Sequence, residues 1–167
     1  TECNCSDFEN NCDFNSTYIC KHIGATFYKF AEACTLEEGT FGNGVLSSIP
    51  FISAEVIPVP EEEVKTGTQL YEPRCLLKLK YENGLTVLII HFGLNEDEHI
   101  NAVKTVMENL EDEKCVLMGD FNVPSHREDG GYPEILASGW FDTYNMAYDK
   151  DGGYTVEGKI DGWLYES

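Results

Sequence analysis

Four polar residues stand directly behind or inside apolar segments, and their types suit phosphate chemistry: His91, Asp120, Asn122 and Asp161. Buried strands that end in polar groups gather those groups at one edge of a sheet, where sites are commonly built. A carboxylate beside a carboxamide suits a hard cation and the oxyanion that this cation neutralises. A histidine can donate a hydrogen bond to a phosphate oxygen or transfer a proton. The four side chains together predict a site for an anionic group and a cation.

Each of these residues also has a purely structural interpretation. The segment Gly119-Asp120-Phe121-Asn122 has a composition that is common in turns. His91 could be a satisfied edge histidine, and Asp161 could pair with Lys159. Asp120 and Asn122 alternate along an extended chain, so their side chains would point the same way. The order of all these residues, each beside an apolar run, favours the functional interpretation.

The surrounding sequence predicts an α/β fold in which strands dominate. Apolar and alternating runs predict strands at 27–30, 45–49, 54–59, 74–81, 86–90, 116–118 and 160–165. Asn83-Gly84 predicts a hairpin turn, and Asn95 followed by Glu98 predicts a capped helix that runs to Leu110. The remaining predictions are short helices at 16–24 and 135–136 and loops at 1–13, 35–42 and 123–133. Hairpins combined with a strand–helix–strand unit are typical of sheets covered by helices.

Charge limits the partners that the protein can bind. The 167 residues include 30 acidic and 11 basic side chains, so the formal net charge is 11 − 30 = −19. The cations are scattered singly and form no basic stripe, which argues against tight binding to nucleic acid. Nucleic-acid chemistry stays open, because a bound Mg²⁺ can reverse the local field. No stretch is long and apolar enough to be a transmembrane segment, and we expect a monomer.

The seven cysteines cannot all pair within one chain, because their number is odd. Cys75 and Cys115 lie in strand-like apolar runs and are predicted to be core residues. The others are Cys3, Cys5, Cys12, Cys20 and Cys34. Their spacing is not that of paired zinc ligands, so disulfides or free thiols are favoured over zinc. Asn15-Ser16-Thr17 is a glycosylation sequon, which matters only in a secreted protein.

Several segments, in this order, resemble the endonuclease/exonuclease/phosphatase superfamily, which includes deoxyribonuclease I, apurinic endonucleases, sphingomyelinases and inositol polyphosphate phosphatases. The most specific match is Leu117–Asn122, which resembles the family's "lmGDFN" motif. The other matching segments are Phe41–Ser47 with Pro50, Glu72–Leu77, Val87–Leu94, Asp142–Tyr144 with Thr155, and Lys159–Asp161. Phe92 departs from the family's "THLG" strand ending, which has leucine there. The resemblance implies one domain over 1–167, with the four-layer α/β/β/α sandwich of deoxyribonuclease I.

The resemblance implies a hydrolase of phosphoester bonds that depends on Mg²⁺ or Mn²⁺. Its substrate would be a small phosphoester, a lipid head group or a nucleic acid. Asp120 would orient or deprotonate the attacking water, and Asn122 would bind the scissile phosphate or help to hold that water. His91 would donate to a phosphate oxygen, and Arg74 would bind substrate.

Two further residues are implied near the metal. Asp161 would lie beside the ion or orient a histidine, and Glu2 would be the family's metal-binding glutamate if Thr1-Glu2 is its "QE" pair. The family's first strand and its closing Ser-Asp-His motif have no counterpart in these residues. We therefore expect an incomplete domain that is weakly active or inactive as a 167-residue polypeptide.

Two alternatives to a catalytic function remain open. A non-catalytic member of the same fold could act as a binding or scaffold module. A cysteine-rich secreted binding module would need its N-terminal cysteines paired or metallated, and it would leave residues 85–165 unexplained.

Overall fold

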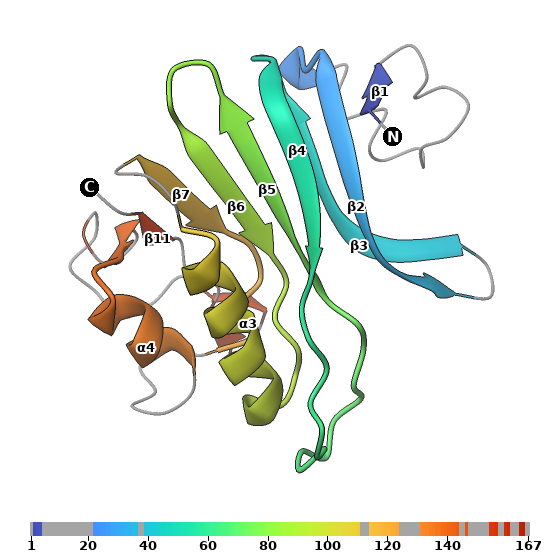
Figure 1. Cartoon of the computed structure of the whole chain (residues 1–167), viewed down its shortest axis with the longest axis vertical. Coiled ribbons are helices and arrows are strands. Elements are labelled where there is room, and N and C mark those ends of the chain that lie inside the picture. Colours follow the sequence, from blue (N-terminus) through green and yellow to red (C-terminus); the bar gives the residue numbers. More distant parts are fainter. Residues whose placement is uncertain are drawn as a thin grey trace.

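The computed structural model describes residues 2–4, 22–36, 39–110, 114–123, 131–143, 146, 154–156, 159–160 and 164–165. In these residues a six-stranded sheet has the order β4 (Phe51–Pro58), β5 (Cys75–Tyr81), β6 (Thr86–Ile90), β7 (Cys115–Met118), β11 (Leu164–Tyr165) and β8 (Phe141–Asp142) (Figure 1). A three-stranded sheet has the order β1 (Glu2–Asn4), β2 (Phe27–Leu36) and β3 (Gly39–Ser47). The short strands β9 (Tyr154–Val156) and β10 (Lys159–Ile160) pair with each other.

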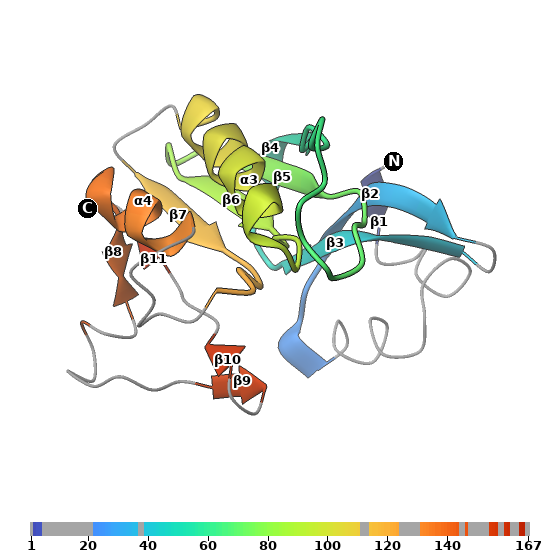
Figure 2. The same ribbon diagram turned by 90° about the horizontal axis from the view of Figure 1, so that it is seen from below.

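Two helices, α3 (Glu96–Glu108) and α4 (Gly131–Ala137), cover one face of the six-stranded sheet (Figure 2). The three-stranded sheet packs on the opposite face, where β2 contacts both β4 and β5. The described part of the chain therefore forms successive layers of helix, sheet and sheet. This arrangement confirms the prediction of an α/β fold with sheets covered by helices.

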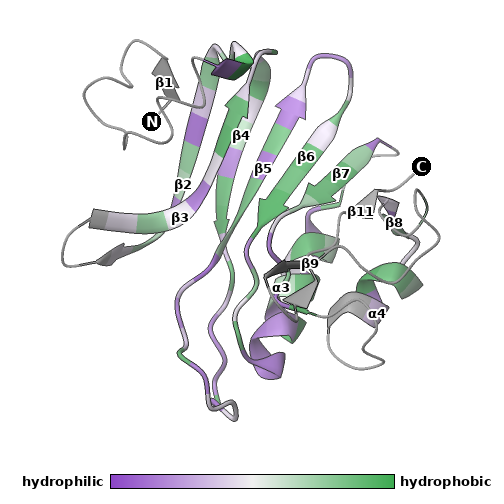
Figure 3. Ribbon diagram, turned by 180° about the vertical axis from the view of Figure 1, so that it is seen from behind, coloured by the Kyte–Doolittle hydropathy of each residue, from purple (hydrophilic) through white to green (hydrophobic). Residues whose placement is uncertain are grey.

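Each layer boundary has its own hydrophobic core, because strand side chains alternate between the two faces. Figure 3 shows hydrophobic residues along β5, β6 and β7, whose two faces are both covered. The core under the helices includes Leu76, Leu88, Ile90, Phe92, Val106, Leu117, Phe121 and Trp140. The core between the sheets includes Ala31, Cys75, Leu77, Leu79, Tyr81, Val87 and Ile89. Burial of each large aliphatic side chain contributes about 1.5–3 kcal/mol, so these two cores fix the sheets in place.

The strand–helix–strand unit was predicted well. β6 occupies the predicted residues 86–90, and β6 and β7 are parallel, with Ile89 opposite Met118. Glu98 accepts a hydrogen bond from the backbone N–H of Asn95 (3.0 Å), as the capping sequence predicts. The Asn83-Gly84 turn joins β5 to β6, and Leu85 N–H donates to the Asn83 side chain (3.1 Å).

The predicted loop over 35–42 was wrong. β2 continues to Leu36 and β3 begins at Gly39, so residues 35–36 and 39–42 belong to paired strands, and residues 37–38 lie outside the described residues. The glycines indicated a loop in the sequence. In the structure Gly42 instead permits close packing of β3 on β2, since a Cβ atom there would overlap the carbonyl oxygen of Ala31.

Two cysteines are core residues, as predicted. Cys75 and Cys115 are buried thiols, and burial raises the pKa of the Cys75 thiol, which keeps it protonated. Cys75 also ties the two sheets together, because its thiol donates to Ala31 O (3.5 Å) and its carbonyl accepts from the Asn43 side chain (2.9 Å). The predicted helix at 16–24 lies largely outside the described residues, as do Cys5, Cys12, Cys20 and the sequon. No helix among the residues that the structure describes is long and apolar enough to cross a membrane.

Candidate active site

The polar residues predicted to act in chemistry meet at one edge of the six-stranded sheet. His91 follows β6 and Asp120 follows β7, and these strands are parallel, so their carboxyl ends finish side by side (Figure 1). Arg74 directly precedes β5, which is antiparallel to β6, so it reaches the same edge. The strand order therefore brings together residues that lie up to 48 positions apart (Arg74 to Asn122: 122 − 74 = 48).

The backbone after β7 is bent tightly against the end of β6. Phe92 N–H donates to Asp120 O (2.9 Å), and Asn122 N–H donates to the Asp120 carboxylate (2.9 Å). Gly119 has a φ of +145°, and a Cβ atom at this position would overlap the carbonyl oxygen of Ile90. Asn122 has a φ of +50°, a left-handed conformation that asparagine tolerates better than most residues. The motif therefore has glycine and asparagine where its backbone needs them.

This bend differs in detail from the predicted extended chain. Asp120 and Asn122 do lie on one side, but a turn closed by the Asp120 carboxylate places them there. Phe121 between them is buried in the core under the helices. The buried phenylalanine anchors the turn and leaves its two polar neighbours at the sheet edge.

Three side chains converge at this edge. His91 Nε2 lies 3.6 Å from Asp120 Oδ2 and 3.2 Å from Asn122 Nδ2. Asn122 Nδ2 also donates to Phe92 O (3.0 Å). The His91 side chain is 31% exposed and that of Asp120 is 41% exposed, so a ligand can reach both. A hydrogen-bonding imidazole, a carboxylate and a carboxamide are therefore available to one bound group.

Arg74 lies behind His91 and is far less accessible. Its side chain is 6% exposed, and its guanidinium carbon lies 5.3 Å from the centre of the Phe41 ring. Nη2 donates to Glu72 Oε2 (3.0 Å), and Nη1 lies 3.3 Å from His91 Nδ1. Phe41 also contacts the His91 ring, with centroids 6.1 Å apart. Arg74 is thus packed against the histidine on the side that faces away from Asp120.

Solved structures of known proteins share this architecture. The chain superposes on an endonuclease/exonuclease/phosphatase family protein from Leptotrichia buccalis C-1013-b, with a TM-score of 0.57, 20% identity, and coverage of 84% of this chain and 58% of that one. An endonuclease/exonuclease/phosphatase from Beutenbergia cavernae DSM 12333 gives a TM-score of 0.60 at 17% identity, with coverage of 91% and 49%. The chain has the deoxyribonuclease I-like endonuclease/exonuclease/phosphatase fold.

A third match is the human Nocturnin catalytic domain with a bound sulfate anion, at a TM-score of 0.61 and 12% identity, with coverage of 98% of this chain and 67% of that one. This chain spans about half to two thirds of the length of these three structures (49–67%). No family model and no curated protein matches the sequence. The structural matches establish the endonuclease/exonuclease/phosphatase fold. Because the identities are low, the activity has to be argued from the residues.

Two residues, Asp161 and Glu2, were predicted near a metal. Asp161 lies outside the described residues. Glu2 lies in β1 opposite Lys29, at the outer edge of the three-stranded sheet, and its side chain is not described. Within the described residues no group of three or more His, Cys, Asp or Glu side chains could hold a metal ion. The donor set at the edge, one carboxylate and one carboxamide, has the oxygen chemistry of a Mg²⁺ site but is too small to bind the ion alone.

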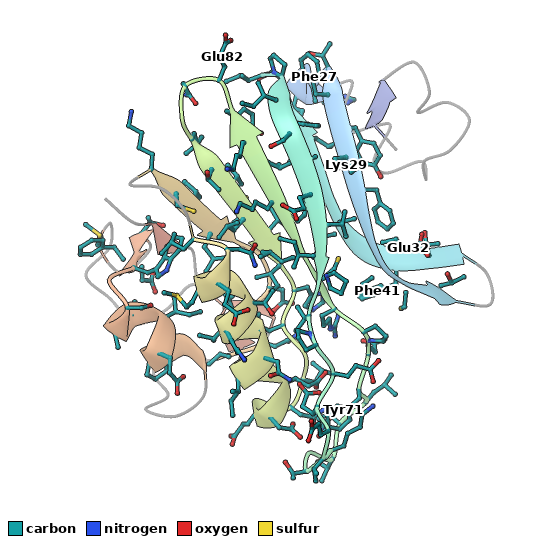
Figure 4. All side chains as sticks on the ribbon, viewed as in Figure 1. Phe27, Lys29, Glu32, Phe41, Tyr71 and Glu82 are labelled. Atoms are coloured by element: carbon teal, nitrogen blue, oxygen red, sulfur yellow. The ribbon has the colours of Figure 1, made fainter. Side chains whose placement is uncertain are left out.

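A second polar network, which no sequence motif predicted, binds the loop between β4 and β5 to the start of α3. Asp97 Oδ2 accepts hydrogen bonds from Tyr71 Oη (2.6 Å), Thr66 N–H (2.8 Å) and Thr66 Oγ1 (3.1 Å). Gln69 N–H donates to the Asn95 side chain (2.9 Å). Figure 4 shows Tyr71 at the far end of this loop, beyond Phe41. We call this set the loop–helix network (Thr66, Gln69, Tyr71, Asn95 and Asp97). Glu72 and Arg74 follow directly in the chain, so the network holds in place the loop segment that leads to them.

The loop–helix network shifts two pKa values. Hydrogen bonds from Thr66 N–H and then from Tyr71 lower the pKa of Asp97 from 3.8 to about 2. Partial burial, and then the hydrogen bond to Asp97, raise the pKa of Tyr71. Asp97 is therefore ionised and Tyr71 protonated at neutral pH. In the sequence Asp97 was only one of three acids in the first turn of a predicted helix, a pattern that the helix dipole explains by itself.

Proposed function

We propose that the protein hydrolyses phosphoester bonds by attack of an activated water on phosphorus, with the help of Mg²⁺ or Mn²⁺. The observation that carries this proposal is the convergence of His91, Asp120 and Asn122 at an accessible sheet edge, within 3.6 Å of one another. The fold adds support, since the proteins that share it include two described as endonuclease/exonuclease/phosphatase.

The hydrogen bonds around Asp120 support its role with water. Its Oδ1 accepts from Asn122 N–H, which fixes the carboxylate plane, and Oδ2 faces the open edge near His91. An oriented carboxylate of this kind can accept a proton from a water molecule as that water attacks. Asp120 would therefore orient the water and act as the base.

Asn122 and His91 would bind the phosphoryl group. One hydrogen of the Asn122 amide is used by Phe92 O, and the amide also faces the His91 ring, so its second hydrogen is available near the accessible edge. Preorganised N–H donors stabilise the negative charge that develops on phosphoryl oxygens during attack. The bound sulfate named for human Nocturnin is a tetrahedral oxyanion of similar shape to a phosphate.

The proposed hydrolysis includes a divalent metal ion, Mg²⁺ or Mn²⁺. When bound, it would neutralise charge on the phosphoryl oxygens. We propose Asp161 as a ligand of this ion; Asp161 lies outside the described residues, and Glu2, the other candidate, lies in β1 at the edge of the three-stranded sheet. Isothermal titration of Mg²⁺ into the complete protein and into its Asp161→Asn variant tests this assignment without an activity assay. Equal affinity in the two proteins would remove Asp161 from the metal site.

The substrate class follows from charge. A net charge of −19 repels long polyanions, so a small phosphoester or a lipid head group is at least as well suited as DNA. Hydrolysis of oligonucleotides, sphingomyelin and inositol phosphates by the complete protein, measured over a range of salt concentrations, separates these classes.

Asp120→Asn is the decisive variant. Asparagine keeps an oxygen for the hydrogen bond from Asn122 N–H, and it removes the basic carboxylate. We expect kcat of the complete protein to fall at least about a hundredfold with an unchanged fold. Glu82→Gln is a matched control, because Glu82 is an exposed acid at the opposite end of β5, beside the hairpin turn. Full activity of Asp120→Asn would remove Asp120 from the mechanism. Inactivity of the wild type on every substrate with Mg²⁺ and Mn²⁺ would favour a non-catalytic binding module.

A further inference from the structure

Arg74 has little surface with which to bind a substrate. Its side chain is 6% exposed, and both terminal nitrogens already face protein groups, Nη1 the His91 ring and Nη2 the Glu72 carboxylate. Its Nε is buried without a hydrogen-bond partner. An arginine that grips a phosphate usually presents two N–H groups to it in a fork. In this protein the terminal N–H groups of Arg74 face His91 and Glu72 instead.

The position of Arg74 determines where the His91 ring can carry its proton. A guanidinium has only donors, so Nη1 can bond to His91 Nδ1 only if Nδ1 is the acceptor. A proton on Nδ1 would instead place two N–H groups against each other at 3.3 Å. The proton of a neutral ring therefore belongs on Nε2, the nitrogen that faces Asp120.

The contact on the other side of the ring does not reverse this assignment. Asn122 Nδ2 lies 3.2 Å from His91 Nε2. Asn122 could donate a hydrogen bond to Nε2 only if Nε2 carried no proton. Asn122 Nδ2 has an alternative acceptor in Phe92 O at 3.0 Å, whereas Arg74 Nη1 is a permanently charged donor. The charged donor is the costlier one to leave unsatisfied in a buried position.

We propose that Arg74 is a positioning residue: it holds the His91 ring with its proton on Nε2, so that this N–H is directed at the bound phosphoryl group beside Asp120. This inference rests on the proposed function for its consequence, but the tautomer can be tested without any substrate. It also replaces the expectation that Arg74 itself binds substrate.

The surroundings of Arg74 suit this role. Glu72 holds the second terminal nitrogen at 3.0 Å, and the Phe41 ring packs against both the guanidinium and the imidazole. Glu72 belongs to the loop between β4 and β5, which the loop–helix network binds to α3. The guanidinium is therefore held in place from the loop and from β3, and His91 is oriented by a group that does not itself move toward the substrate.

Nitrogen NMR of the complete protein with ¹⁵N-labelled histidine tests the tautomer directly. His91→Gln identifies the His91 signals by their loss. We expect the wild type to carry its proton on Nε2 at neutral pH, and Arg74→Met to shift the ring toward the other tautomer, because Asn122 can then donate to Nε2. A wild-type spectrum with the proton on Nδ1 overturns the proposal even if the variant fails to fold. An unchanged tautomer in a folded Arg74→Met overturns it too.

Kinetics distinguish positioning from substrate binding. In the complete protein, Arg74→Met should lower kcat about tenfold to a hundredfold, the range found for groups that orient a catalytic residue, with KM changed less than about threefold. Arg74→Lys, which keeps a donor, should recover part of the loss. A raised KM with unchanged kcat would instead make Arg74 a substrate ligand. If the wild type has the expected tautomer but no hydrolytic activity, the proposed function fails and the positioning of His91 by Arg74 stands.

Discussion

The molecule holds the same three residue types, histidine, aspartate and asparagine, in two polar clusters that are built differently. The strand-edge cluster consists of His91, Asp120 and Asn122. The helix-start cluster is the set His99, Asp97 and Asn95 at the start of α3, whose side chains bond to Gly93, to Thr66 and Tyr71, and to Gln69, respectively. In the first, the histidine and the carboxylate are 3.6 Å apart and 31% and 41% exposed. In the second, one carboxylate oxygen accepts three hydrogen bonds of 2.6–3.1 Å.

The two histidines show the difference most clearly. His99 is 3% exposed, donates from Nε2 to Gly93 O (3.0 Å) and packs against Phe92. His91 is partly exposed, and its Nε2 lies 3.2 Å from Asn122 Nδ2 and 3.6 Å from Asp120 Oδ2. Buried polar groups that form hydrogen bonds inside the protein stabilise it, whereas polar groups that stay accessible can bind a ligand. Residue type alone therefore does not identify a site, and the hydrogen bonds around each group do.

The largest expected effect is a difference in stability between variants of two glycines, Gly119 beside the strand-edge cluster and Gly93 before the helix-start cluster. Both glycines are closely packed. Gly119→Ala would force a Cβ into the carbonyl oxygen of Ile90 at a φ of +145°, so neither atom can yield easily. Gly93→Ala would meet the Glu98 carboxylate, which is a side chain and can move at the cost of its capping hydrogen bonds to Asn95. We expect a loss of about 3 kcal/mol or more in unfolding free energy for Gly119→Ala and about 1 kcal/mol for Gly93→Ala, measured by urea unfolding. Equal losses would mean that the bend after β7 is less constrained than its geometry indicates.

The next largest effect is a contrast between the two histidines: one variant should lose activity and the other stability. His91→Gln should lower kcat of the complete protein about a hundredfold and the unfolding free energy by no more than about 1 kcal/mol, because the side chain is partly exposed and the buried Arg74 Nη1 loses one acceptor. His99→Gln should lower the unfolding free energy by about 1–3 kcal/mol and leave kcat per folded molecule unchanged, because the ring is buried. Steady-state kinetics and urea unfolding of both variants check the pair. The comparison fails if the two variants lose the same property.

The sequence predicted the strand-edge cluster well because local patterns determine it. The apolar run of β6 and the glycine-aspartate motif after β7 each define a strand end, and parallel pairing then brings His91 to Asp120. The turn that places Asn122 beside Asp120 was predicted only as an extended chain, since its left-handed φ of +50° depends on the buried Phe121. The strand residues 35–36 and 39–42 were missed because the glycines in this segment are equally typical of loops.

The loop–helix network could not be predicted in the same way. Thr66 and Tyr71 are 31 and 26 positions from Asp97, and the loop that carries them has no periodic pattern. Its contacts depend on how the loop folds over α3, which only the assembled sheet and helix decide. The burial of Arg74 was missed for a similar reason, because it requires Phe41 from a distant strand and Glu72 from this loop.

The smallest expected effect is the pH dependence of the stability that Asp97, in the helix-start cluster, contributes. The pKa of Asp97 is lowered from 3.8 to about 2 in the folded protein, chiefly by the hydrogen bond from Thr66 N–H. A carboxyl with a lowered folded-state pKa contributes stability that is fully present above its unfolded pKa and is lost as pH falls through the folded pKa. Asp97→Asn should therefore be less stable than the wild type near neutral pH, and urea unfolding should show this difference shrinking between about pH 5 and about pH 2.

Tyr71→Phe shows whether the loop is responsible for that pH dependence. Its hydroxyl donates to Asp97 Oδ2 (2.6 Å) and accepts from Gly67 N–H (2.6 Å), so its removal should weaken the same network. Because the two residues share one hydrogen bond, the stability losses of Asp97→Asn and Tyr71→Phe should not add in the double variant. Additive losses would mean that the Tyr71 hydroxyl does not stabilise the protein through Asp97, and the two hydrogen bonds from Thr66 would then be what joins the loop to Asp97.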